Sequence, residues 1–225
     1  MSDSLLMQGL IQIFSPEIVP ELLVSKLESY LNEIERFNPV YGLISVDNHE
    51  ALITRHILDS LAPLNIISGI ISDSARIADV GSGAGLPGIP LALCLPGCSL
   101  CLIERSGRRA AFLRTCVAAL SLDNVTICEE QLEHYLPHSF NLVAFRALRH
   151  MDERLLHFLF RILAPGGVLV AYKGRMNTIT AEMSVLESYC TWEAVPVETP
   201  FLPEERHLVV IRPATSEKKM GTDLL

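Results

Sequence analysis

Hydrophobic and polar positions follow two different patterns in the two parts of this chain. Before about residue 65, apolar side chains recur at helical intervals, as at Leu52, Ile53, Ile57 and Leu61. From Ala75 onward, short apolar runs alternate with helical segments. That alternation is typical of a parallel sheet whose strands are joined by helices. The pattern therefore predicts an α/β fold preceded by a helical segment that is poor in strands.

Apolar runs and capping signals give the predicted elements. Strands are expected at 75–80, 99–103, 124–128, 140–145 and 166–173, followed by 191–199 and 207–212 as an antiparallel hairpin. Helices are expected at 86–95, 107–120, 151–163 and 178–189, and the third of these is stopped by the sequence APGG. Nearer the start, Ser15 is placed to cap a helix that has Pro16 in its first position and runs to about Phe37. Asp47 and Glu50 have capping-box spacing at the start of another helix.

Length and composition indicate one globular unit. The 225 residues are 49% hydrophobic and can bury a sizeable core. We expect residues 1–65 to form a helical segment packed on a larger domain at 66–213, with a disordered tail at 214–225. No run is apolar enough to span a membrane, and residues 1–10 lack the features of a signal peptide. We therefore expect a cytoplasmic protein, and a monomer.

Cysteine and histidine spacing raises the question of a metal site. Most of the six cysteines lie in apolar runs, which is typical of buried thiols. Cys94, Cys98 and Cys101 have a metal-like spacing, but they span a predicted helix and a predicted strand, so their side chains need not converge. The histidines at 134 and 138 belong to a loop that contains proline. We predict no metal site.

The charge distribution gives two opposing indications. A formal net charge of −8 argues, taken alone, against a nucleic-acid partner. Basic residues nevertheless cluster in three places: Arg105, Arg108, Arg109 and Arg114; Arg146, Arg149 and Arg154; and Lys173 with Arg175. A solvated helix face explains the first cluster as well as an RNA contact does.

The stretch ADVGSGAGLPGIPLA, residues 78–92, follows the first predicted strand and opens a helix. Turns of this kind bind anionic or nucleotide ligands because backbone amides and the helix dipole meet there. Glycines allow positive φ and leave no Cβ between the backbone and a ligand. Pro87 and Pro90 fit the first turn of a helix, where N–H groups have no partner within the helix. The loop is therefore the predicted binding site.

Three ligand classes compete for this loop. A phosphate-binding P-loop needs Lys followed by Ser or Thr after its last glycine, and this chain has neither there. A dinucleotide fingerprint occurs at Gly83, Gly85 and Gly88, but its first glycine should directly follow the strand, and that glycine is Gly81. The third class, S-adenosylmethionine, is held by a similar turn and by a carboxylate after the second strand. Glu104 is that carboxylate, although a dehydrogenase would use it in the same way.

Five stretches resemble one protein family in their order and spacing: RHILDSLAPL (55–64), ADVGSGAGLPGIPLA (78–92), RRAAFLR (108–114), APGGVLVAYKG (164–174) and ERHLVVI (205–211). The chain is similar to the glucose-inhibited division protein B family of bacterial methyltransferases. The resemblance implies a Rossmann-like class I fold, with a mostly parallel seven-stranded sheet and helices on both faces. It also implies methyl transfer from S-adenosylmethionine to N7 of a guanine in 16S ribosomal RNA, either as free RNA or within the small ribosomal subunit or its assembly intermediate.

The resemblance also assigns the site residues. The family's cofactor contacts fall on Gly81, Gly83, Gly85, Leu86, Glu104, Leu132, Glu133 and Arg146. The family more often has Asp at the position of Glu104, and the longer side chain keeps the carboxylate. Phe145 stands where the family has Ser, whereas Arg146 is kept.

The implied reaction needs no general base. Guanine N7 has an in-plane lone pair and no proton to lose, so orientation supplies most of the acceleration of an in-line displacement at the sulfonium methyl. Arg146, at the end of the fourth predicted strand, is the predicted catalytic residue because it can bind the methionine carboxylate or an RNA phosphate. Asp59 and Glu104 are available to stabilise the cationic product, although Glu104 is better used on the ribose.

Further residues are expected to contact RNA. Arg55 and Asp59 share a helix face and can form an ion pair beside His56, either packing the N-terminal segment or lining the crevice. The predicted RNA-binding set is Arg55, His56, Arg108, Arg109, Lys173 and Arg175. With 6% aromatic residues there is no obvious stacking platform, so recognition would rest on shape and phosphates. Two alternatives stay open: a small-molecule methyltransferase, favoured by the acidic charge, and a non-catalytic nucleotide-binding module.

Overall fold

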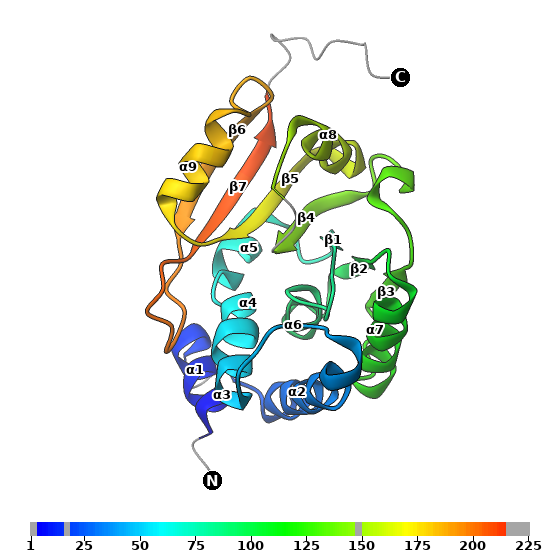
Figure 1. Cartoon of the computed structure of the whole chain (residues 1–225), viewed down its shortest axis with the longest axis vertical. Helices are drawn as coiled ribbons and strands as arrows, with labels where there is room; N and C mark the ends of the chain where they lie inside the picture. The colour runs from blue at the N-terminus through cyan, green and yellow to red at the C-terminus, as the bar shows by residue number, and fades with distance from the viewer. Residues whose placement is uncertain (1–3, 16–18, 147–149, 215–225) are drawn as a thin grey trace.

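A seven-stranded sheet forms the centre of the molecule, in the order β3-β2-β1-β4-β5-β7-β6 (Figure 1). The structure is a computed structural model, and it describes residues 4–15, 19–146 and 150–214. The strands are β1 Arg76–Val80, β2 Ser99–Ile103, β3 Val125–Cys128, β4 Phe140–Arg146, β5 Leu163–Lys173, β6 Cys190–Pro196 and β7 His207–Pro213. Strands β1 to β5 pair in parallel, whereas β7 runs antiparallel to both β5 and β6. The predicted fold class and the closing hairpin are confirmed.

Helices cover both faces of the sheet because successive strand residues point to opposite sides. On one face, Ile77 and Leu142 pack in a buried cluster with residues of α5 and α6. On the other face, Ala78 and Val143 pack in a cluster with residues of α8 and α9. The helices around the sheet are α5 Leu64–Ile70, α6 Gly88–Cys94, α7 Gly107–Ala119, α8 Glu153–Ile162 and α9 Met176–Ser184.

In the part of the chain that precedes β1, the described residues form helices joined by loops, with no strand. This part contains α1 Leu5–Phe14, α2 Glu21–Tyr41, α3 His49–Leu52, the π-helical turn η1 Ile53–Leu58, and α4 Asp59–Leu61. These helices share one buried cluster with α6 and α7, to which Leu6, Leu27 and Ile57 contribute. Figure 1 shows α1, α2 and α3 together at the end of the molecule away from β6. The division into segments at residue 65 stays a prediction.

The predicted helix start at Ser15 was wrong. Ser15 instead follows the last residue of α1, in a conformation with φ of 74°, and its N–H donates to Ile11. The following helix begins only at Glu21, with Pro20 in the capping position. Pro16 lies outside the described residues. The reason is that the apolar run at 5–14 forms a helix of its own, which the cap signal at Ser15 did not reveal.

Other predicted boundaries moved by smaller amounts. Asn48, rather than Asp47, caps α3 by accepting a hydrogen bond from the N–H of Ala51 at 2.8 Å. The APGG stretch lies within β5, because that strand begins at Leu163. The last helix covers Met176–Ser184 instead of 178–189. The predicted disordered tail at 214–225 lies outside the described residues, except for its first residue, Ala214. No described helix is both long and apolar enough to cross a membrane.

Strand order reverses between β1 and β4, and this places the candidate site. The chain leaves β1 toward β2 and β3 on one side, and then returns to β4 and β5 on the other. In open α/β sheets, ligands bind outside the carboxyl ends of the strands at such a reversal. The glycine loop after β1, Glu104 after β2, and Arg146 at the end of β4 all lie at this edge.

Candidate active site

The loop after β1 is held in place by the next strand and by its own turn. The N–H of Gly81 donates to the carbonyl of Ile103 at 2.9 Å, and the N–H of Gly85 donates to the carbonyl of Ser82 at 2.7 Å. Gly81, Gly83 and Gly85 have φ of 72°, 58° and 92°. These values lie in the left-handed region that favours glycine, so the glycine-rich composition follows from the shape of the turn.

Glu104 connects this loop to β2. Glu104 is 4% exposed, and one oxygen of its carboxylate accepts a hydrogen bond from Gly83 N–H at 2.9 Å. The other oxygen accepts from Ser106 N–H at 2.8 Å. Each carboxylate oxygen has a second lone pair, so both can also accept a hydrogen bond from a ligand hydroxyl.

Asp79 lies beneath the same loop and is almost completely buried, at 1% exposure. One carboxylate oxygen accepts from the Gly88 N–H at 3.0 Å, and the other has no hydrogen-bond partner in the described structure. Burial raises the pKa of Asp79 to about 7, against opposing contributions from the Gly88 N–H and from Arg146. Gly88 is required here, because a Cβ at this position would lie 2.7 Å from the Asp79 carboxylate.

The N-terminal helices reach the loop through Tyr30 of α2. This fully buried side chain donates its hydroxyl hydrogen to the carbonyl of Ala84 at 2.6 Å. The contact joins residues far apart in the sequence and closes the outer side of the loop. Position 30 was not among the predicted site residues, since only the tertiary structure brings it to the loop.

The described residues suit S-adenosylmethionine. A Cβ placed on Gly83 would meet only the Gly81 carbonyl oxygen, at 3.8 Å, so the backbone of the loop is open on that side. The Glu104 carboxylate is fixed at the end of β2, where it can accept hydrogen bonds from the two hydroxyls of a ribose. The loop therefore has the glycines that its turn requires, and the Glu104 carboxylate can still accept hydrogen bonds from a ligand.

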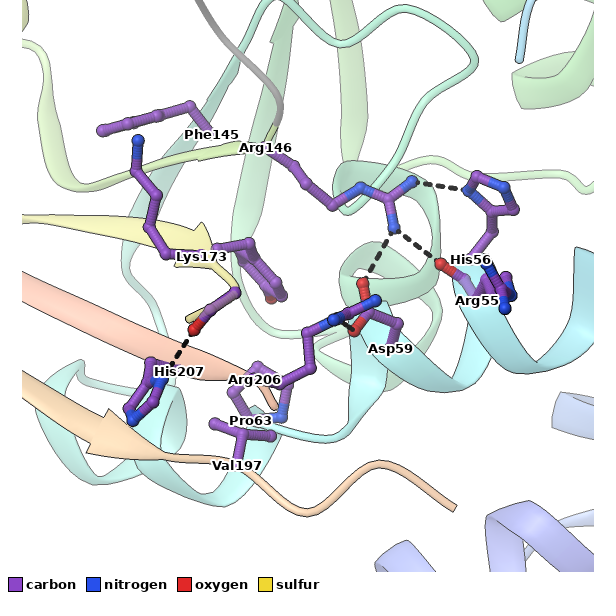
Figure 2. Close-up of a pocket in the computed structure, with 12 residues that line it drawn as sticks. Arg55, His56, Asp59, Pro63, Phe145, Arg146, Lys173, Val197, Arg206 and His207 are labelled. Carbon is purple, nitrogen blue, oxygen red and sulfur yellow. Dashed lines mark hydrogen bonds and ion pairs between the residues drawn. The ribbon is translucent and has the colours of Figure 1, made fainter. Parts of the chain in front are cut away.

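A cavity of about 370 Å³ opens at the ends of β4 and β5, next to the helical run of η1 and α4 (Figure 2). This volume is at the lower end of the range for small-molecule sites. The cavity is lined by Arg55, His56, Asp59, Pro63, Phe145, Arg146, Tyr172, Lys173, Gly174, Val197, Arg206 and His207. Among these described lining residues, Asp59 carries the only carboxylate, whereas four are Lys or Arg.

Arg146 projects from β4 toward the helical run (Figure 2). One guanidinium nitrogen lies 3.2 Å from a carboxylate oxygen of Asp59, and the other lies 3.0 Å from Nδ1 of His56. Arg206, which precedes β7, pairs with the second Asp59 oxygen at 2.9 Å. The Arg146 and Asp59 side chains are 15% and 10% exposed, so this network is largely removed from water.

The predicted ion pair between Arg55 and Asp59 was wrong. Arg55 pairs instead with Glu204 at 2.8 Å, while Asp59 is shared by the two other arginines. The π-helical turn over Ile53–Leu58 explains this, because its wider winding separates side chains four apart that an α-helix would align. Arg55 also contributes its backbone carbonyl, 3.4 Å from Arg146.

His56 is held in its neutral form. Burial lowers its pKa to about 4, the nearby Arg146 charge acts in the same direction, and a hydrogen bond to the backbone of Ser45 acts against them. A neutral imidazole has one nitrogen that accepts a hydrogen bond. Nδ1 of His56 therefore accepts from Arg146, which fixes the tautomer with hydrogen on Nε2.

Comparison with known proteins now identifies the family. The family described as rRNA small subunit methyltransferase G matches residues 23–209. Ribosomal RNA small subunit methyltransferase G of Treponema pallidum is 38% identical, with 92% of this chain and 93% of the relative covered. The protein of the same name from Nitrosococcus oceani is 35% identical over 84% of this chain and 86% of its own length. The chain belongs to this family.

Solved structures agree on the fold. A SAM-dependent methyltransferase from Aquifex aeolicus has a TM-score of 0.57 at 13% identity, covering 80% of this chain and 97% of that one. A precorrin-6y C5,15-methyltransferase from Geobacter metallireducens has a TM-score of 0.51 at 19% identity, covering 76% and 91%. Membership and fold together confirm S-adenosylmethionine as the cofactor and the chain as a methyltransferase of small-subunit ribosomal RNA.

The structure places the predicted RNA-binding residues of this methyltransferase in three regions. Arg55, His56 and Lys173 line the cavity. Arg108 and Arg109 belong to the first turn of α7, where the Arg108 guanidinium lies 5.9 Å from the centre of the Tyr41 ring. The third region is the start of α9, where the predicted RNA-binding residue Arg175 is exposed. Arg149, from the second basic cluster, lies outside the described residues.

The remaining predicted cofactor residues lie on the loop side of the crevice. Leu86 is buried at the end of the glycine loop, and Leu132 is buried in the short turn η2 Leu132–His134 after β3. Arg161 of α8 holds this turn by donating to the carbonyls of Glu133 at 2.6 Å and Tyr135 at 2.9 Å. In the described part of the chain, no three His, Cys, Asp or Glu side chains are grouped to hold a metal ion.

Tyr172 and Arg206 line the cavity but were not predicted as site residues. Tyr172 donates its hydroxyl hydrogen to the Ser60 carbonyl at 3.0 Å, and Arg206 binds Asp59. Both lie in stretches that carried the family resemblance, YKG and ERHLVVI. Their location in these stretches was the only sign that they belong to the site. Their hydrogen-bond partners, Ser60 and Asp59, are more than a hundred residues away in the sequence, so the contacts could not be predicted.

Proposed function

We propose that the protein methylates N7 of a guanine in 16S ribosomal RNA, with the cofactor on the glycine loop and the base in the cavity lined by Arg146. The single observation that carries this proposal is the position of Arg146. It stands at the strand-order reversal, close enough to the loop to lower the pKa of Asp79, and it also lines the cavity. One side chain thus borders both halves of the crevice.

The cofactor half consists of the residues expected from the family resemblance. Gly81, Gly83, Gly85 and Leu86 form the loop, Glu104 binds the ribose hydroxyls, Leu132 and Glu133 border the adenine, and Arg146 faces the methionine carboxylate. The hydrogen bonds of Glu104 to Gly83 and Ser106 support this assignment, because they fix the carboxylate before a ligand arrives. Such preorganisation lowers the entropic cost of binding.

Bound S-adenosylmethionine supplies an electrophilic methyl group on a sulfonium. The chain's own residues then have to orient the acceptor, since guanine N7 needs no proton removed. Arg146 is fixed by Asp59 and His56, so it can hold a carboxylate or a phosphate without moving far. Neutral His56 does not add a second positive charge beside a base that becomes cationic.

The RNA half uses local positive charge on an acidic protein. Arg55, Arg146, Lys173 and Arg206 surround the cavity, while the chain as a whole carries −8. Arg55 and Lys173 are paired with Glu204 and Glu182, at 2.8 and 2.7 Å. We infer that phosphates compete for these partly exposed cations and thereby position the strand.

The decisive experiment measures 7-methylguanosine in small-subunit RNA by nucleoside mass spectrometry. A strain that lacks the protein should lose the modification, and the wild-type gene should restore it. Arg146→Ala should fail to restore it, whereas Arg212→Ala, on an exposed position of β7, should restore it fully. An unchanged 7-methylguanosine content in the deletion strain would refute the proposal. Methylation of a metabolite without RNA would favour the small-molecule alternative.

A further inference from the structure

Two thiols meet where β2 and β3 lie side by side. Cys101 is in β2, and Cys128 is the last residue of β3. The register pairs Cys101 with Thr126 and Ile103 with Cys128, so the two cysteines point to the same face, two residues apart along the strands. Their sulfur atoms are 2.7 Å apart, compared with about 2.05 Å in a disulfide bond. Both are free thiols.

The two cysteines differ in access and in acidity. Cys101 is buried at 7% exposure, whereas Cys128 is half-buried on the edge strand of the sheet. A hydrogen bond from the Cys101 thiol lowers the pKa of Cys128 to about 6, although burial opposes it. The same contact, together with burial, raises the pKa of Cys101. The hydroxyl of Tyr135 lies 3.5 Å from the Cys101 sulfur and 3.8 Å from the Cys128 sulfur.

We propose that Cys101 and Cys128 form a reversible disulfide on exposure to hydrogen peroxide. The Cys128 thiolate attacks one peroxide oxygen, the O–O bond breaks, and the released hydroxide takes a proton to become water. Cys128 is then a sulfenic acid. The Cys101 sulfur attacks this sulfur, the S–S bond forms, and the S–O bond breaks, so that OH leaves with the Cys101 proton as a second water. The thiols lose two electrons, which reduce the peroxide.

The disulfide would act on the cofactor half of the crevice through the backbone of Cys128. Its carbonyl accepts hydrogen bonds from the N–H groups of Glu104 and Glu130, both at 3.0 Å. The same residue therefore anchors the predicted ribose carboxylate and the start of the segment that leads to Leu132. Any displacement at the end of β3 is passed to both.

Closing the bond requires such a displacement. A two-residue offset on neighbouring strands separates Cα atoms by about 8 Å, because strands rise about 3.3 Å per residue and lie about 4.8 Å apart. Disulfides usually join Cα atoms no more than about 6.8 Å apart, so the backbone must close by on the order of 1 Å. Oxidation should therefore weaken cofactor binding. This expected loss of affinity rests on the proposed role of Glu104, but the formation of the disulfide does not depend on that role.

The test uses the reduced full-length protein, hydrogen peroxide, peptide mapping by mass spectrometry, and calorimetry with S-adenosylmethionine. Peroxide should produce a linked Cys101–Cys128 peptide pair with the loss of two hydrogens. Cofactor affinity should fall about tenfold, which corresponds to losing one hydrogen bond to a charged group, and dithiothreitol should restore it. Cys128→Ser should show no fall on peroxide treatment. Cys94→Ser, which changes a half-buried thiol outside the pair, should respond as the wild type does.

Each outcome bears on one part of the proposal. Stable sulfenic or sulfinic acid on Cys128 without a linked peptide refutes the disulfide. A linked peptide with unchanged affinity refutes its coupling to the cofactor. Failure of the reduced wild type to bind S-adenosylmethionine counts against the cofactor assignment, and the disulfide is then judged from the peptide map alone. If Cys128→Ser does not fold, Cys101→Ala removes the same bond.

Discussion

Replacing Asp79 by Asn should change how the stability of the protein depends on pH. The carboxyl group is buried under the glycine loop, and one of its oxygens lacks a hydrogen-bond partner in the described structure. Because burial raises its pKa to about 7, the folded protein keeps this proton across a pH range in which the unfolded chain has already released it. The unfolded chain therefore gains stability relative to the folded one as the pH rises toward 7.

The size of the effect follows from the two pKa values. An unfolded Asp titrates near about 3.9, so the difference of about 3 corresponds to an upper limit of about 4 kcal/mol. Relaxation and water entry reduce this limit, and we expect roughly 2–4 kcal/mol. The wild type should lose that much stability between about pH 4 and pH 7, and no more above it. Asn cannot ionise, so Asp79→Asn should lack this loss.

Urea denaturation of both proteins at several pH values from about 5 to 8 measures the effect. The free energy of unfolding of Asp79→Asn, relative to the wild type, should rise with pH and level off near pH 8. Other groups titrate in both proteins and cancel in the difference. Asp123→Asn, which changes an exposed carboxyl, should give a difference that is nearly constant. A constant difference for Asp79→Asn as well would show that the reasoning is wrong.

Four further substitutions test the loop, the cavity and a comparison turn at Gly42. Tyr30→Phe should lower the free energy of unfolding by about 1–2 kcal/mol, because a buried loop carbonyl 2.6 Å from the hydroxyl loses its partner; unchanged denaturant midpoints would contradict this. His56 is protonated more readily in the unfolded chain than in the folded protein, because its folded pKa is about 4. The free energy of unfolding of the wild type should therefore fall by up to about 3 kcal/mol as the pH drops from 6.5 through about 4. Acid denaturation of His56→Gln should lack this fall. Gly85→Ala should lower the free energy of unfolding by more than about 2 kcal/mol, because φ is +92° there and the new Cβ would lie 2.6 Å from the Ile89 side chain. Gly42→Ala should lower it by only about 1 kcal/mol, because φ is +56° but no atom lies within 4 Å of the new Cβ. Equal melting temperatures of the Gly85→Ala and Gly42→Ala variants would refute this contrast.

The strands were predictable because each is a short apolar run bounded by turn residues. In β1 and β2, the buried runs after Arg76 and Ser99 are continuous, as expected for strands covered on both faces. The end of each parallel strand also predicted where Glu104 and Arg146 would lie. Those positions depend only on local pattern and on the common direction of the strands.

The partners of the site residues were not predictable in the same way. Asp59 has the spacing to pair with Arg55, yet it binds Arg146 and Arg206, which come from other elements. The π-helical turn that changes this alignment leaves no signal in the hydrophobic pattern. Likewise, α1 was not expected, because its ten residues have no charged side chain to define a polar face. Local sequence patterns predict where helices and strands lie, but the contacts between their side chains depend on long-range packing.

The uneven distribution of charge affects how this enzyme meets its substrate. Four cations line the cavity of a molecule whose total charge is −8, so the rest of the chain carries a net negative charge, which repels a polyanion. With RNA bound at the cavity, as we propose, collisions in most other orientations are disfavoured. Added salt screens the repulsion as well as the attraction. The association rate should therefore change less with ionic strength than that of a uniformly basic RNA-binding protein, for which salt only weakens the encounter.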